Sequence, residues 1–165
     1  MIQSIKLLID ALREELQNYG EMLALLDRQQ AYLIAREASE VFQSISLIKA
    51  QGAAIQRSRA SREESRRVVA VDAQLAPETG FNDLIPLLPA DYQPLLQALV
   101  AENNELLMRV RRRARQNHLM LRRSVELMQE LLNSLMPTRQ NSIYDGTGSR
   151  PAYAPAARQL YEAVG

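Results

Sequence analysis

The sequence predicts an all-α protein, with three long helices in an elongated antiparallel bundle or coiled coil, an irregular connector and a flexible C-terminal tail. Three observations predict this class. Apolar residues recur every three or four positions over long stretches of residues 2–136, which is the spacing of a helical seam. Prolines interrupt residues 73–90, and residues 137–165 are rich in Pro, Gly, Ser and Ala. We therefore expect a helical bundle over residues 1–136 and a tail over residues 137–165.

The composition narrows the classes of protein that the chain can represent. Its 165 residues suit one domain, and its net charge of +1 does not by itself call for a nucleic acid or an anionic membrane. The absence of cysteine excludes disulfides and thiolate zinc sites. The N-terminus lacks the apolar core of a signal peptide, and no stretch approaches the ~18 uncharged apolar residues of a membrane span. We expect a cytoplasmic protein with no membrane insertion.

The first helix is expected over residues 2–33. At ~1.5 Å per residue it forms a rod of roughly 48 Å, which needs partners of similar length. Its seam is spaced three and four throughout, and its one polar member is Gln30; the seam comprises Ile2, Ile5, Ile9, Leu12, Leu16, Tyr19, Leu23, Leu26, Gln30 and Leu33.

A second helix is expected over residues 38–72. The step of five from Leu33 to Ala38 breaks the phase, and Ser39 is a candidate N-cap. A hairpin turn near residues 34–38 explains the break, although no Gly or Pro marks it, so one long kinked helix is the alternative. The apolar series of this helix is Ala38, Val41, Ile45, Ile48, Gly52 and Ile55.

The second half of this helix has little to bury. Residues 56–67 read QRSRASREESRR, which is polar on almost every face. We expect a solvated or frayed rod end here, with the valines at positions 68, 69 and 71 docking again.

Residues 73–90 predict a structured connector, because four breakers alternate with apolar residues. We expect at most one short turn of helix in it, lying on a hydrophobic surface. The third helix is expected over residues 91–136, with Asp91 as N-cap, Pro94 in the first turn and Pro137 as its stop. Its seam contains polar members, which can fix helix register at a cost in stability: Leu96, Leu99, Asn103, Leu106, Val110, Arg113, Asn117, Met120, Ser124, Leu127 and Leu131.

No constellation in the chain favours catalysis. His118 is the one histidine, and no cysteine accompanies it, so no familiar metal set is present. The adjacent carboxylates Glu14 and Glu15 diverge on a helix, and neither a phosphate-binding loop nor an ExxH pair occurs. We expect a protein that is not an enzyme, with no catalytic residue, metal or cofactor.

A basic run, RVRRRARQNHLMLRR, occupies residues 109–123 of the third helix. It is compatible with a phosphate-binding helix. Ion pairing with acidic residues of the first helix, together with solvation, is the interpretation that we favour, because no aromatic residue is interleaved and the chain is near neutral. We therefore do not expect nucleic acid as a partner.

The end of the third helix has more apolar circumference than one seam requires. Two interpretations stay open, a core surface or a core surface that also binds an amphipathic partner helix, for which methionine is well suited. The residues are Val125, Leu127, Met128, Leu131, Leu132, Leu135 and Met136.

The tail retains tyrosines although it lacks the apolar density to fold. Tyr144 is followed by Asp145 and Gly146, which favour a turn. We interpret this element as a short linear motif read by another protein, with folding back onto the bundle as the alternative. Tyr153 and Tyr161 receive no role.

The order of these features resembles the FlgN-type flagellar export chaperones. A heptad-rich N-terminal hairpin is followed by a long helix that ends in LLNSL, then by a proline and by SIYDGTG, over residues 131–148. The resemblance implies a cytoplasmic, non-enzymatic chaperone whose clients are the hook–filament junction proteins FlgK and FlgL. It implies client binding through Val125, Met128, Leu131, Leu132 and Leu135, and docking on the export-gate protein FlhA through Tyr144, Asp145 and Gly146.

Two alternatives accompany this interpretation. An arginine-rich helical protein that binds nucleic acid or acts as a regulator would show steeply salt-dependent binding. A self-associating coiled-coil scaffold would show concentration-dependent helicity and the mass of a dimer without any client.

Overall fold

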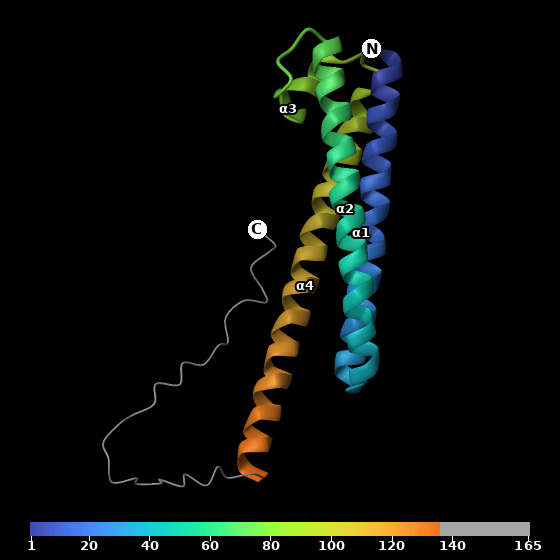
Figure 1. Cartoon of the computed structure of the whole chain (residues 1–165). Helices are drawn as coiled ribbons and strands as arrows, with labels where there is room; N and C mark the ends of the chain where they lie inside the picture. Colours follow the sequence, from blue (N-terminus) through green and yellow to red (C-terminus); the bar gives the residue numbers. More distant parts are fainter. Residues whose placement is uncertain (136–165) are drawn as a thin grey trace, which may run out of the picture.

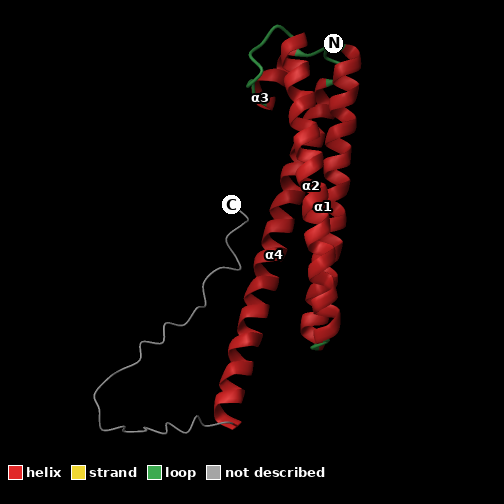
Figure 2. Ribbon diagram, viewed as in Figure 1, coloured by secondary structure: helices red, strands yellow, loops and turns green. Residues whose placement is uncertain are grey.

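A computed structural model describes residues 1–135 and contains three long helices and one short one. Helix α1 spans Ile2–Ala35, α2 spans Ala38–Asp72, α3 spans Phe81–Leu84 and α4 spans Gln93–Leu135. A single 3-10 turn, η1, follows α3 over Ile85–Leu87. The all-α class is therefore confirmed (Figures 1 and 2), and the expected three long helices are joined by the short α3 in the connector.

Helices α1 and α2 form a hairpin, so the kinked-rod alternative is wrong. Arg36 adopts the left-handed conformation with φ of 59°. Its amide donates to the Leu33 carbonyl, and the amide of Glu37 donates to the Tyr32 carbonyl at 3.0 Å. This is the Schellman arrangement, which usually has glycine in the left-handed position. Arginine occupies that position here, which explains why no glycine marks the turn in the sequence.

The beginnings of α2 and α4 differ from the predicted caps. The N-cap of α2 is Glu37, whose side chain makes no capping hydrogen bond, and Ser39 already lies inside the helix. Helix α4 begins at Gln93, two residues after Asp91. The Leu96 amide donates to the Tyr92 carbonyl at 3.0 Å, so the backbone of Tyr92, rather than the Asp91 carboxylate, begins this helix.

One core cluster lies at the end of the bundle that holds the connector. Residues of α1 and α4 pack there against the end of α2, and the connector supplies Leu84, Ile85 and Leu88. This confirms that the connector is structured and lies on a hydrophobic surface. The cluster comprises Ile5, Leu8, Ile9, Leu12, Val69, Ala70, Leu84, Ile85, Leu88, Leu96 and Leu99.

The second core cluster lies midway along the bundle, where α1, α2 and α4 meet through Tyr19, Met22, Leu26, Ile55 and Val110. The predicted seam of α1 contains two heptad series, which are buried to different extents. Ile5, Leu12, Tyr19 and Leu26 of one series are buried, whereas in the other only Ile9 is buried and Leu16, Leu23 and Gln30 are half-buried. A third series, which the apolar pattern did not show, is buried as well: Leu8, Glu15, Met22 and Gln29. By contrast, Ile2 is exposed.

Two buried asparagines fix the register of α4 along α1. The Asn103 amide nitrogen donates to the Leu12 carbonyl at 3.0 Å, and that of Asn117 donates to the Leu26 carbonyl at 2.8 Å. Both pairs join residues 91 positions apart. A shift of α4 would break both bonds together, which is the register role expected of a polar seam residue.

The polar segment 56–67 is docked rather than frayed, contrary to the prediction. Ser58 and Arg66 are buried, and Arg62 forms an ion pair with Glu15 of α1 at 3.3 Å. A small serine lets two helices approach, and an arginine can bury its methylene stem while its charged end finds partners. Polar residues therefore replaced the apolar contacts that this segment lacks.

Candidate functional site

The C-terminal end of α4 extends past the α1–α2 hairpin without a packing partner (Figure 1). Met120 and Leu121 are the last half-buried residues of the helix, and every described residue from Arg122 to Leu135 is exposed. We call residues 122–135 the overhang. The five predicted client-binding residues all lie on it with exposed fractions between 51% and 70%: Val125, Met128, Leu131, Leu132 and Leu135.

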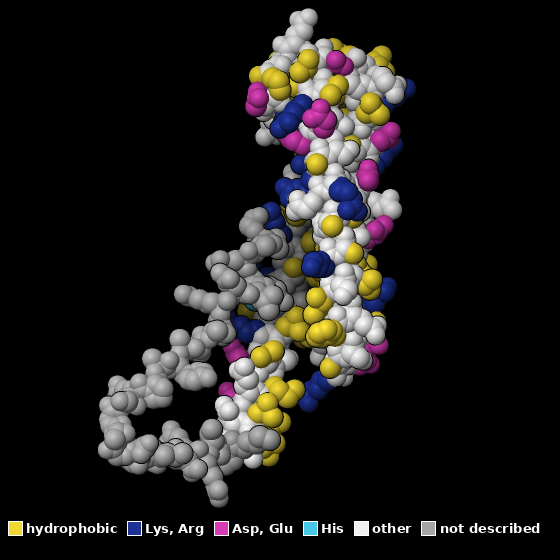
Figure 3. All heavy atoms as spheres, viewed as in Figure 1, with side chains coloured by type: hydrophobic (Ala, Val, Ile, Leu, Met, Phe, Trp, Pro, Cys, Tyr) yellow, Lys and Arg dark blue, Asp and Glu magenta, His cyan; other side chains and the backbone are white. Residues whose placement is uncertain are grey.

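The overhang continues the face of α4 that packs against the hairpin. Eighteen residues make five turns of an α-helix, so residues eighteen apart point in the same direction. Val110 and Asn117 are buried in the bundle, and Met128 and Leu135 lie eighteen residues after them. Figure 3 shows hydrophobic side chains along this end of α4 on the side toward the hairpin. The core interpretation of these residues is wrong for the folded chain alone, because they are exposed.

A second group of exposed apolar side chains lies at the tip of the hairpin. Ile34, in the last turn of α1, is 70% exposed, Phe42 of α2 is 79% exposed, and Ile45 is 41% exposed. We call these three residues the tip patch. The sequence placed Ile45 in the buried series and gave Phe42 no role. The signal that could have found the patch is a second stripe on α2, Ala38–Phe42–Ile45, beside the inward stripe of the buried Val41 and Ser44 and the half-buried Ile48.

The arginine run of α4 is mostly not paired with the acidic residues of α1. Arg113 forms an ion pair with Asp27 at 2.8 Å, which is the kind of pairing expected. Arg122 pairs with Glu126 of its own helix at 3.0 Å. Within residues 1–135, the remaining five arginines of the run are exposed and form no ion pair: Arg109, Arg111, Arg112, Arg115 and Arg123.

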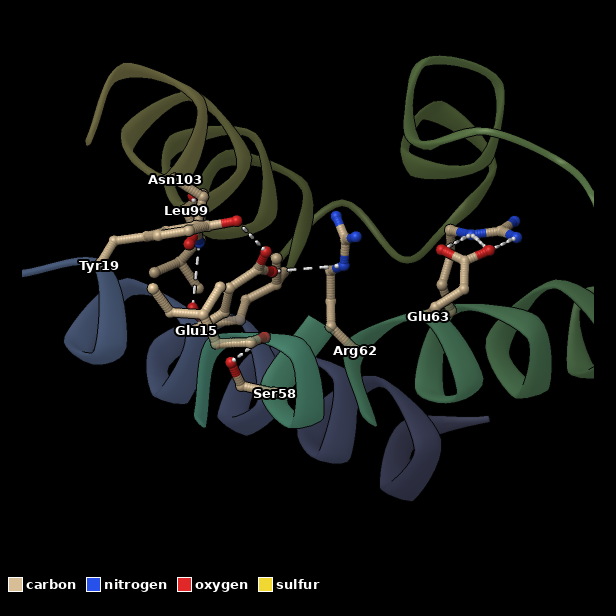
Figure 4. Close-up of polar contacts among 10 residues, drawn as sticks. Glu15, Tyr19, Ser58, Arg62, Glu63, Leu99 and Asn103 are labelled. Atoms are coloured by element: carbon tan, nitrogen blue, oxygen red, sulfur yellow. Dashed lines mark hydrogen bonds and ion pairs between the residues drawn. The ribbon is translucent and has the colours of Figure 1, made fainter. Parts of the chain in front are cut away.

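A buried polar cluster holds α1 and α2 together near the middle of the bundle (Figure 4). The Tyr19 hydroxyl donates to Glu15 Oε1 at 2.9 Å, and Arg62 Nε lies 3.3 Å from Glu15 Oε2. The Arg62 guanidinium also lies 5.8 Å from the centre of the Phe81 ring. Burial, together with the hydrogen bond to Glu15, raises the pKa of Tyr19 to about 12. A neutral Tyr19 phenol and a Glu15 carboxylate that is paired with Arg62 suit a structural role.

A cavity of about 310 Å³ opens beside this cluster, lined by Arg62, Phe81 and Asn103 among others. Residues 1–135 contain no group of three or more His, Asp or Glu side chains able to hold a metal ion. No helix in that part of the chain is long and apolar enough to cross a membrane. The predicted docking residues Tyr144, Asp145 and Gly146 lie outside the described residues.

Comparison with known proteins decides the family. A model of the FlgN protein family matches residues 1–152. The chain belongs to the FlgN family. The resemblance inferred from the leucine run and the SIYDGTG element is thus confirmed at the level of the family. No curated protein and no solved structure gave a match.

Membership of the FlgN family fixes the coarse function. FlgN-family proteins are flagellar export chaperones, which bind export substrates and are not known as enzymes. The matched range includes the whole of the overhang and the tail residues 144–146. In this FlgN-family chain, the exposed apolar face of the overhang is therefore the candidate surface for an export substrate.

Proposed function

We propose that this FlgN-family protein binds the C-terminal helical region of the hook–filament junction proteins FlgK and FlgL on the overhang of α4. The observation that carries the proposal is an apolar face that continues a packed seam and has nothing to pack against. An amphipathic client helix would extend the coiled coil along this face. The overhang would thereby cover the apolar stripe of the client helix and keep the client from pairing with other chains until export.

Calorimetric titration with the C-terminal peptide of a hook–filament junction protein tests this proposal. We expect micromolar or tighter binding by the wild type, little changed between two salt concentrations, because apolar burial rather than charge drives it. Leu131→Asp and Leu135→Asp should abolish binding, since each places a carboxylate in the seam. Leu87→Asp is the matched control, because Leu87 is equally apolar and 62% exposed but lies in η1. Absence of binding by the wild type would refute the proposal.

We further propose that Tyr144, with Asp145 and Gly146, docks the loaded chaperone on the cytoplasmic domain of the export-gate protein FlhA. The support is the sequence: a large aromatic side chain between turn-forming residues suits a short motif that binds reversibly. Tyr144→Ala should abolish capture by the FlhA domain while leaving client affinity unchanged. Equal capture by Tyr144→Ala and by the wild type would refute this role, and Tyr153→Ala is the matched control.

The unpaired arginines of α4 support a second candidate function, binding of a nucleic acid. Five exposed cations on one helix form an electrostatic footprint. If a nucleic acid binds there, its affinity should fall steeply with salt, and Arg112→Gln with Arg115→Gln should weaken it. The client titration would be unchanged by the same pair of substitutions, which separates the two functions.

A further inference from the structure

Two residues of the tip patch, Ile34 and Ile45, follow the faces of their helices that contact α4. Ile34 lies four residues after Gln30, whose amide contacts Met120 of α4, and seven after Asp27, which pairs with Arg113 of α4. Residues three, four and seven apart share a face of a helix. Ile45 precedes Ile48 by three residues, and Ile48 packs against the core cluster that contains Val110 of α4.

Helix α4 separates from the hairpin toward this end of the molecule (Figures 1 and 2). The exposed fractions of the tip patch, up to 79% at Phe42, show that α4 does not cover it. Figure 3 shows hydrophobic side chains gathered on the lower part of the hairpin and again on the end of α4. The tip patch and the overhang are therefore both exposed apolar surfaces without a partner in the described chain.

The sequence spacing of the apolar residues on both surfaces indicates which kind of element could cover them. On α2, Ala38, Phe42 and Ile45 are spaced four and three. On α4, the apolar residues of the inner face repeat with steps of four, three, four and three, at Leu121, Val125, Met128, Leu132 and Leu135. Two heptad stripes accept the ridges of a third helix. The complementary element is an amphipathic helix with an apolar stripe broad enough to touch both.

We propose that the tip patch is the second half of the client site, so that an amphipathic client helix lies between the overhang and the hairpin tip and contacts both. This inference rests on the proposed client binding by the overhang. It adds the prediction that affinity depends on α2, a helix on which the sequence placed no binding residue. Because Phe42 is the largest and most exposed residue of the patch, it should contribute most.

The same calorimetric titration with the full-length chain tests the inference. Phe42→Ser should weaken binding of the client peptide about tenfold or more, since burial of one aromatic side chain has that effect. Leu47→Ser is the matched control: Leu47 is 53% exposed on the same helix but lies about 140° from Phe42 and about 160° from Ile45 around the helix axis. Circular dichroism should show both variants folded, because both side chains are exposed.

Cross-linking gives a second measurement that does not depend on affinity. The chain has no cysteine, so Phe42→Cys and Leu132→Cys each introduce one thiol. With an added disulfide such as oxidised glutathione as the oxidant, client peptides that carry one cysteine at successive positions of the apolar stripe should cross-link to Phe42→Cys from one position and to Leu132→Cys from another, whereas Leu47→Cys should cross-link to none. Cross-linking at Leu132 without any at Phe42 would overturn the inference.

The outcomes separate this inference from the function on which it rests. Wild-type affinity in Phe42→Ser, with binding lost in Leu135→Asp, would overturn the second half of the site and leave the overhang as the whole site. No binding by any variant or by the wild type would refute the proposed function itself. A dimer detected by light scattering that dissociates in Phe42→Ser would assign the tip patch to a second copy of the chain and overturn the inference.

Discussion

The hydroxyl of Tyr19 is buried at the junction of three helices, and its bond to Glu15 ties its protonation to folding. The pKa of this phenol is about 12 in the folded chain, against about 10 when it is unfolded. Below pH 10 the phenol is neutral in both states. Between pH 10 and about 12 the unfolded chain loses the proton more readily, so the free energy of unfolding falls as pH rises.

Urea unfolding at pH 9 and pH 11 should show this loss in the wild type, by at most about 1.4 kcal/mol per pH unit. Tyr19→Phe should have a weaker dependence on pH over the same interval, because it removes the ionising group. Tyr32→Phe is the control and should keep the wild-type dependence, since it leaves Tyr19 and its hydrogen bond to Glu15 in place. An unchanged slope in Tyr19→Phe would refute the coupling.

Asn117 illustrates how one polar residue contributes to the packing of two long helices. Its amide nitrogen donates to the Leu26 carbonyl at 2.8 Å and to Gln29 Oε1 at 3.0 Å. Asn117→Ala should lower the free energy of unfolding by roughly 1–3 kcal/mol, because Gln29 Oε1 is left without this donor in a buried site. Asn104→Ala, at an exposed position of the same helix, should stay within about 0.5 kcal/mol of wild type. Equal effects of the two substitutions in urea unfolding would contradict this account.

At the scale of the elements, the C-terminal ends of α1 and α2 both place a residue other than glycine in the left-handed region. Arg36 ends α1 with φ of 59°, and Gln74 follows α2 with φ of 60°. After α2 the Leu75 amide donates to Ala70 and that of Gln74 to Val71, both at 2.9 Å. The two helices therefore end in the same Schellman arrangement, and each carries the steric cost of a Cβ atom in that region.

Arg36→Gly should raise the free energy of unfolding by about 1 kcal/mol, because glycine removes that steric cost. Arg36→Ala is the control, since it removes the guanidinium but keeps the Cβ atom and should give no gain. Chemical denaturation of the three chains measures both effects. A gain in Arg36→Ala equal to that in Arg36→Gly would show that the side-chain charge, rather than the backbone, is responsible.

The sequence predicted the helices far better than it predicted which of their faces are buried. In α1 the series from Ile5 to Leu26 was found because all of its members are apolar or tyrosine. The parallel series with Glu15 and Gln29 was missed because these polar residues are buried by partners far along the chain, Arg62 at 3.3 Å and Ser44 at 3.0 Å. Apolar periodicity cannot show a buried position whose partner is a specific polar group.

The same limit applies to the candidate site. The apolar residues of the overhang were recognisable from their density, but core and surface could not be separated, because that depends on where the hairpin ends. Its end depends on the turn at Arg36, which the break in apolar phase placed near residues 34–38 but which no Gly or Pro marks. The tip patch was missed for the same reason: Phe42 differs from a core residue only in that no helix of the described chain reaches it.

At the scale of the whole molecule, stability and client binding reside in different parts of one helix. Leu96, in the first turns of α4, is fully buried, whereas Leu132 is 51% exposed. Leu96→Ser should lower the free energy of unfolding by about 3 kcal/mol or more, and Leu132→Ser should change it by no more than about 0.5 kcal/mol. In the client titration, Leu132→Ser should bind the client peptide more weakly than the wild type does. A large loss of stability in Leu132→Ser would contradict the separation.

The position of the hairpin turn has a consequence for the size of the exposed surface. Residues 122–135 are fourteen in number, two heptads or about 21 Å of helix. Inserting two heptads into α1 before Arg36 and two into α2 after Glu37 would move the reversal to the end of α4 without changing any phase. Such a hairpin would reach as far as residues 122–135 and would leave the tip patch two heptads before the new turn. The reversal point therefore determines how many turns of α4 remain available to another protein, although it lies on neither the client-binding helix nor the tail.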